Sequence, residues 1–221
     1  MSHYKLSPSD FAFLYEECKL CYWLKVKHKI NTPTLPFPGV FSTINTMFQT
    51  PLVGKNLKSV SSSLPDALVE SQEGHVESEK IPNTNVYVKG KYDLLVKKED
   101  GTYILVDLKI SKPEEDKIDK YKTQLGAYKY ALEHPANGNP VRISELALLV
   151  FYPDQVEMHK DSVKIAFPPI WMPVPIDDSG FLQFAKDIDT LLSGPAPEED
   201  SNCKWCNYRH EGERIAHVKN I

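Results

Sequence analysis

The chain has 221 residues, of which 41% are hydrophobic, and carries a net charge of −4 at neutral pH. This length and composition fit one large domain and give no overall basic signature, so a nucleic-acid partner would need a local basic groove. Because no apolar run approaches a membrane span and no signal peptide is evident, we expect a protein of the reducing cytoplasm with no membrane partner.

The first predicted element is a helix near the amino terminus. Ser7 has the chemistry of a helix cap, Pro8 suits the first helical position, and Asp10 completes a capping box. Apolar residues then follow helical spacing, so Cys18 and Cys21 are expected on one face of this helix.

The next 40 residues are harder to interpret. They contain a Pro-rich turn, a short helix near 41–50 and an exposed loop at 54–73. The remaining elements are clearer from their periodicity. We predict strands at 75–81, 86–97 and 102–110, a helix from 113 to about 133, strands at 143–152 and 155–166, a Pro-rich loop at 168–175 and a helix at 179–192.

Two of these strands form a predicted hairpin through the loop 99–101. The resulting register sets Asp93 opposite Asp107 and places apolar pairs on the other face, while Lys109 lies beside Asp107. Opposed carboxylates destabilise a strand pair, and a divalent cation with oxygen ligands would offset this. The alternative is a solvated sheet face on which the charges do no harm.

The following helix carries Gln124 and Tyr128 one turn apart on the same face. Each residue also has an interpretation without a functional role: Gln124 as a solvent-exposed glutamine and Tyr128 as a half-buried tyrosine of the core. Their position directly after the acidic hairpin favours a shared site.

The chain has four cysteines, in two CxxC pairs near its ends: Cys18, Cys21, Cys203 and Cys206. This spacing favours one four-thiolate site, for zinc or an iron–sulfur cluster, that joins the two termini. The alternative is two separate pairs of buried free cysteines.

Taken together, these motifs resemble the RecB-like branch of the PD-(D/E)XK nuclease superfamily. The similarity lies in GxxD at 90–93, DxK at 107–109, QxxxY at 124–128, the opening segment at 6–10 and the cysteine segments. It implies an α/β fold with a restriction-endonuclease-like core, αβββαβ, whose mixed central sheet is flanked by helices. It also implies one domain over 1–221, with its core at about 74–166 and a cysteine cluster subdomain formed by 1–30 and 194–221.

The resemblance is greatest to stand-alone exonucleases with a cysteine cluster, such as those of CRISPR spacer acquisition, and to AddB-type nuclease domains. It implies a deoxyribonuclease that uses Mg²⁺ or Mn²⁺, with DNA, as single strands or duplex ends, as partner, and a protein partner in DNA processing or CRISPR adaptation. The implied catalytic residues are Asp93, Asp107, Lys109, Gln124 and Tyr128. The implied metal ligands are Asp93, Asp107 and the carbonyl of Leu108, and a [4Fe–4S] cluster would be bound by Cys18, Cys21, Cys203 and Cys206.

The sequence departs from this family in two places. The family usually has one amino-terminal and three carboxy-terminal cysteines, whereas here they are two and two, which leaves zinc as an alternative. A His or Glu is also usual on a helix before the GxxD strand, and here the nearest histidine, His75, lies on a strand instead. The alternative function is therefore a weak or inactive nuclease that binds DNA ends or a partner protein.

Overall fold

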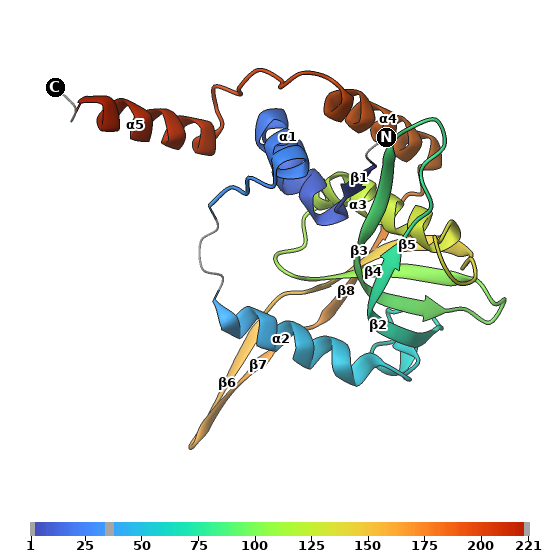
Figure 1. Ribbon diagram of the computed structural model, residues 1–221. Helices are drawn as coiled ribbons and strands as arrows, with labels where there is room; N and C mark the ends of the chain where they lie inside the picture. The colour runs from blue at the N-terminus through green and yellow to red at the C-terminus, as the bar shows by residue number, and fades with distance from the viewer. Residues whose placement is uncertain (1–2, 34–37, 219–221) are drawn as a thin grey trace.

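The structure is a computed structural model that describes residues 3–33 and 38–218 (Figure 1). The strands are β1 (Tyr4–Leu6), β2 (Leu68–Glu77), β3 (Val86–Lys97), β4 (Tyr103–Ile110), β5 (Ile143–Phe151), β6 (Gln155–His159), β7 (Ser162–Ala166) and β8 (Pro169–Val174). The α-helices are α1 (Lys19–His28), α2 (Gly39–Gln49), α3 (Asp116–Glu133), α4 (Asp178–Ser193) and α5 (Lys204–Val218). Among the described residues, no helix has both the length and the apolar character needed to cross a bilayer.

Strand β3 is the centre of a six-stranded mixed sheet in which β1, β3, β4, β5 and β8 follow one another. Strand β2 pairs antiparallel with one edge of β3. The opposite edge of β3 has two partners. Strand β4 pairs antiparallel with residues 94–97, and the short β1 pairs in parallel with residues 86–88. Residues 89–93 lie between these two partners, so the sheet has a gap at this edge of β3.

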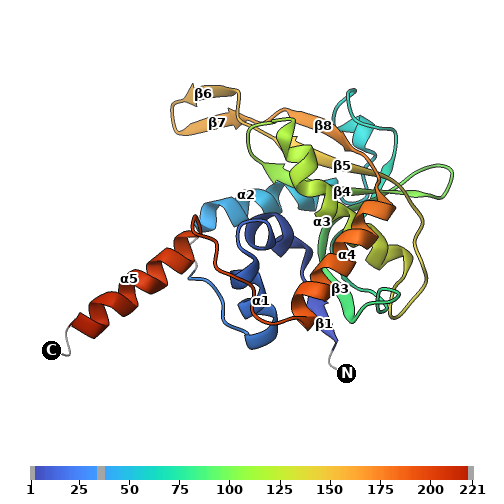
Figure 2. The same cartoon turned by 90° about the horizontal axis from the view of Figure 1, so that it is seen from above.

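Helices cover both faces of the sheet, as the restriction-endonuclease-like core predicts (Figures 1 and 2). On one face, β3, β4 and β5 pack beneath α2, where the rings of Phe48 and Phe151 stack 4.4 Å apart. On the other face, α3 packs on the same strands through Leu125 and Leu132. Helices α1 and α4 join α3 there, in a cluster that includes all four cysteines.

The hairpin has the predicted register over residues 94–97 and 103–106, and the regular ladder ends just before the expected pair of Asp93 and Asp107. Leu94 pairs with Val106 and Val96 with Ile104, and these apolar side chains are buried on the α2 face. The other face is buried as well, since Leu105 lies beneath α3. A solvated face for the two aspartates is therefore wrong, because α3 covers the half of the sheet on which they lie.

The amino-terminal helix is not continuous. A 3-10 turn (Pro8–Asp10) and a π turn (Phe11–Tyr15) come first, and the Ser7 side chain makes no capping hydrogen bond. Cys18 is extended, with φ −163°, and caps α1 instead of lying within it. The two cysteines therefore do not share a helix face, because the thiol of Cys18 accepts the Cys21 N–H at the start of the helix.

Other differences concern segments between the core elements. The loop expected at 54–73 is packed, with Leu57 and Val69 fully buried, and β2 begins at Leu68 rather than 75. The single strand expected at 155–166 is the β6–β7 hairpin, which projects from the body (Figure 1). The Pro-rich segment after it forms β8, which tolerates proline because it is an edge strand. Helix α5 was not predicted.

Candidate active site and metal centre

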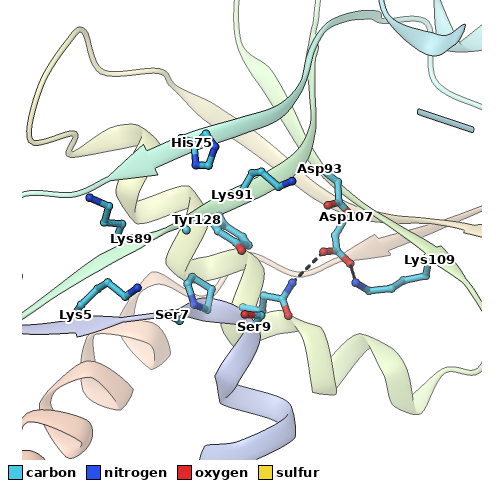
Figure 3. A pocket seen from close by; sticks show the side chains of 13 residues that line it. Lys5, Ser7, Ser9, His75, Lys89, Lys91, Asp93, Asp107, Lys109 and Tyr128 are labelled. Carbon is cyan, nitrogen blue, oxygen red and sulfur yellow. Dashed lines mark hydrogen bonds and ion pairs between the residues drawn. The ribbon is translucent and has the colours of Figure 1, made fainter. Parts of the chain in front are cut away.

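The gap beside β3 opens into a cavity of about 580 Å³ (Figure 3). Its walls come from β3 and β4, from α3, from β2 and from the segment that follows β1. The lining includes all of the catalytic side chains expected from the sequence, which are Asp93, Asp107, Lys109, Gln124 and Tyr128. Leu108, the remaining expected residue, is buried and donates its backbone N–H to Asp93.

Gly90 explains why the GxxD and QxxxY motifs occur together. A Cβ atom at this position would lie 2.9 Å from Cε1 of Tyr128 and 3.1 Å from Cδ of Pro8. Only a glycine lets the Tyr128 ring pack on the backbone of β3. The two motifs are therefore joined by a direct contact across the cavity.

Asp107 is the most enclosed of the acidic groups, with 5% of its surface exposed. Its Oδ1 accepts a hydrogen bond of 2.9 Å from Gln124 Nε2, and its Oδ2 lies 2.5 Å from Lys109 Nζ. Burial raises the pKa of this carboxyl, although the charge of Lys109 opposes the shift. The side chain is thus fixed on both oxygens, by an amide and by an ammonium group.

Asp93 faces the same space from β3. Its Oδ2 accepts the Leu108 N–H at 2.8 Å, so the carboxylate takes a backbone donor of β4 just beyond the last regular pair of the hairpin. Burial and the negative charge of Asp107 raise its pKa to about 6, against the opposing effects of Lys109 and the Leu108 N–H. The structure therefore places two carboxyls where a full negative charge on both is unfavourable.

Lys109 is held between the acidic pair and an aromatic ring. Its Nζ lies 4.5 Å from the centre of the Tyr121 ring, which packs beneath it from α3. Burial disfavours its charge, but Asp107 and Asp93 outweigh this effect and raise its pKa. The ammonium group therefore stays protonated at neutral pH, although it is largely enclosed.

Tyr128 closes the cavity from the α3 side. It is 5% exposed and its hydroxyl contacts the backbone of Lys91. Burial, together with the charges of Asp107 and Asp93, raises its pKa, so the phenol remains neutral. It can donate a hydrogen bond but cannot act as a base at ordinary pH.

The acidic pair fits a divalent cation in chemistry but supplies few ligands. Two ionised aspartates beside one lysine give the site a net negative charge, which a cation would neutralise. Mg²⁺, Mn²⁺ and Ca²⁺ all take oxygen ligands. In the described part of the chain, however, the only cluster of three or more acidic, His or Cys ligands is formed by the cysteines. His75 lines the cavity wall from β2 without joining the two aspartates, and α2 packs on the opposite face of the sheet.

The four cysteines meet at the other candidate site. All are buried, and their four sulfur atoms lie within 4.8 Å of one another. Cys18 lies just before α1 and Cys203 just before α5, while the second cysteine of each pair sits in the first turn of the helix. The sequence predicted that the two cysteine pairs meet at one site, and the clustering of the four cysteines confirms this.

The sulfur spacing bears on which metal this site can hold. The Sγ of Cys206 lies 3.8 Å from those of Cys18 and Cys21, and the Cys21 and Cys203 sulfurs are 3.7 Å apart. Bonds of about 2.3 Å to one tetrahedral zinc ion put neighbouring sulfurs about 3.8 Å apart. A [4Fe–4S] cluster sets four irons and four sulfides between its cysteines, so these side chains would have to move apart.

Several lining residues were not predicted from the sequence. The opening segment contributes Lys5, Ser7 and Ser9, and β3 contributes Lys89 and Lys91. The alternation of β3 could have indicated its two lysines, since they share the face of Asp93. The alternation of the opening segment does not indicate that it lines a cavity, because it reaches the cavity only through the pairing of β1 with β3, about 80 residues later in the chain.

One comparison with known proteins identifies the family of this chain. A solved structure described as "Crystal structure of SSO0001" is similar over 91% of this chain and 82% of its own, at 15% identity and a TM-score of 0.47. No curated protein matches this chain. The family model of the PD-(D/E)XK nuclease superfamily matches residues 50–210, which include the whole GxxD, DxK and QxxxY constellation. The chain belongs to the PD-(D/E)XK nuclease superfamily, whose members are generally metal-dependent nucleases.

Proposed function

We propose that the protein is a deoxyribonuclease that hydrolyses phosphodiester bonds with the help of Mg²⁺ or Mn²⁺. The observation that carries the proposal is the enclosed group of Asp93, Asp107 and Lys109, backed by Gln124, at the end of a basic cavity. The similarity of the motifs to stand-alone RecB-like exonucleases supports an exonuclease in particular.

Each side chain has a role that follows from its contacts. Asp93 and Asp107, with the carbonyl of Leu108, would hold the cation, and Gln124 keeps Asp107 in its orientation. When bound, such a cation polarises a phosphate oxygen and makes a water molecule more acidic. Lys109 remains protonated and would stabilise the negative charge that develops on the phosphate during attack.

The cysteine site would stabilise the fold and take no part in the reaction. We propose that it holds one tetrahedral zinc ion, because three of the distances between the sulfur atoms, 3.7–3.8 Å, match those around such an ion and all four atoms lie within 4.8 Å of one another. The [4Fe–4S] cluster implied by the resemblance is the competing assignment. In both cases the metal would join the start of α1 to the start of α5, which are far apart in sequence.

A second candidate function has one observation in its favour. Within the described residues, only two carboxylates meet at the catalytic site. A protein that binds DNA ends or a partner without cutting would show such an incomplete ligand set. The intact pairing of Lys109 with Asp107 favours the nuclease instead.

The test is cleavage of single-stranded and duplex DNA with Mg²⁺, Mn²⁺ or Ca²⁺. We expect hydrolysis with Mg²⁺ or Mn²⁺ but not with Ca²⁺, and none for Asp107→Ala. An exonuclease would release mononucleotides or short products from ends and spare a circular substrate. Equal trace cleavage by wild type and Asp107→Ala would show that the activity comes from a contaminant, and the binding function would then replace the nuclease.

A further inference from the structure

A second cavity, of about 450 Å³, lies beside the catalytic one. Lys5 of β1 and Ser7, which follows the strand, line both cavities, so the two spaces meet at this end of β1. The second cavity is enclosed by β1, by the end of α1 and by Tyr87 of β3. Figure 3 shows Lys5 at the end of the catalytic cavity away from Lys109, and Lys5 also lines the second cavity.

The lining of this second cavity is basic, although the chain as a whole is acidic. His3, Lys5, Lys25 and Lys29 face it with one carboxylate, Asp10. That carboxylate is already bound to Lys25, at 2.6 Å. Lys5 has no carboxylate partner in the part of the chain that the structure describes, so its charge is available to an anion.

Lys29 has an unusual backbone for its residue type. It follows α1 with φ 60°, a left-handed conformation that glycine adopts at lower cost. Its Nζ donates to the carbonyl of Val26 at 2.9 Å, which holds the side chain along the end of the helix. The exposed Lys29 side chain therefore lies on the cavity wall, with its ammonium group near the end of the helix.

One aromatic and two basic side chains, Tyr87, Lys89 and Lys91, follow one another on one face of the part of β3 that leads from the second cavity towards Asp93, since successive strand residues point to opposite sides. Tyr87 is half-buried and lies directly beside Lys5 of β1 in the parallel register. Six residues of strand span about 20 Å, which leaves room for more than one nucleotide between Tyr87 and Asp93.

We propose that the second cavity is a nucleotide subsite for an unpaired strand whose cleaved phosphodiester bond, more than one nucleotide away along β3, lies at Asp93 and Asp107. The base stacks on Tyr87, and Lys5 and Lys29 bind phosphates on either side of it. A cationic groove with an accessible aromatic ring, here the half-buried ring of Tyr87, is the combination that binds single strands, because a base offers its face only when it is unpaired. This subsite depends on the proposed nuclease function in one respect only, which is that cleavage takes place in the catalytic cavity.

The test is binding of a short fluorescein-labelled oligothymidylate, followed by anisotropy in buffer dialysed free of divalent cations. We expect Tyr87→Leu to weaken binding about tenfold, in the range found for single stacked bases. Lys5→Gln should lower the slope of log affinity against log salt by about 0.7, the effect of one lost phosphate contact on a single strand. The matched controls are Tyr103→Leu and Lys97→Gln, a packed tyrosine–lysine pair at the opposite end of the hairpin.

Because this assay needs no catalysis, its result is independent of the nuclease proposal. Loss of binding in Tyr87→Leu and Lys5→Gln, but not in the controls, supports the subsite even if no DNA is cut. Unchanged binding in both variants overturns the subsite even if the protein cuts DNA well. Equal affinity for a blunt duplex of the same length, weakened to the same extent by both substitutions, would overturn the assignment to an unpaired strand.

Discussion

The raised pKa of Asp93 predicts that removing its charge stabilises the cation-free protein. Asp93→Asn keeps an oxygen that can accept the Leu108 N–H but carries no charge to be desolvated or repelled by Asp107. The shift from 3.8 to about 6 is about two units, which corresponds to about 3 kcal/mol at 1.36 kcal/mol per unit. We therefore expect the variant to be more stable at pH 8 by up to about 3 kcal/mol, as an upper bound.

The sign of the pH dependence follows from the direction of the shift. A carboxyl whose pKa is raised on folding favours the folded state at low pH, where it is protonated in both states without penalty. This stability is lost as the pH rises from about 4 through about 6, and no further change is expected above that range. The advantage of Asp93→Asn should accordingly fall to about half at pH 5 and to about a fifth at pH 4.

Urea unfolding at several pH values measures this difference. The protein is dialysed free of divalent cations without a chelator, so that a tightly held cysteine metal stays bound, and Asp154→Asn serves as a control for the loss of one exposed negative charge. Adding Mn²⁺ should stabilise the wild type more than the variant, because a cation that binds only the folded state adds stability by mass action. A variant that is destabilised equally at pH 5 and pH 8 would refute the electrostatic reasoning.

Three further predictions follow from the same contacts. Lys109→Ala should lower turnover at least about a hundredfold while cation binding is kept, because the substitution removes a transition-state contact but leaves both aspartates; loss of cation affinity in calorimetry would contradict this role. Gly90→Ala should lower the free energy of unfolding by about 1–3 kcal/mol and displace Tyr128, since the added methyl group would meet its ring at 2.9 Å. Chemical denaturation measures this cost. The control is Gly54→Ala, whose Cβ would meet nothing within 4 Å but whose φ is +77°, so it shows the cost of backbone strain without crowding. Elemental analysis should find about one zinc per chain, lost in Cys203→Ser; iron with acid-labile sulfide would show that the cysteines hold an iron–sulfur cluster.

The hairpin and its helix could be predicted because their signals are local. The turn at 99–101 sets the register, and a slip of one residue would bury Asp107 against Leu94, so the apolar pattern alone fixes which residues pair. The spacing of Gln124 and Tyr128 is likewise a property of one helix. The cysteine pairs needed only the inference that two CxxC pairs, with no cysteine left over, meet at one site.

The remaining differences come from long-range contacts that leave little trace in the local pattern. Strand β1 has three residues and forms only because an unpaired stretch of β3 edge is available to it. The burial of Leu57 and the edge position of β8 depend in the same way on neighbours elsewhere in the chain. Helix α5 has mostly charged and polar residues, so its sequence shows no buried stripe by which it could be recognised.

The gap in the sheet connects these observations to the chemistry. If β4 continued to pair with β3 beyond Leu94, the Leu108 N–H would be taken up by the ladder and Asp93 would lose its only backbone donor among the described contacts. Because the strands separate there, the Asp93 carboxylate takes that donor, α3 brings Gln124 and Tyr128 to the opening, and β1 brings Lys5 to its far side. The acidic pair and the basic wall thus depend on one interruption of strand pairing, and a substitution that extended the β3–β4 ladder would be expected to close the cavity and remove both.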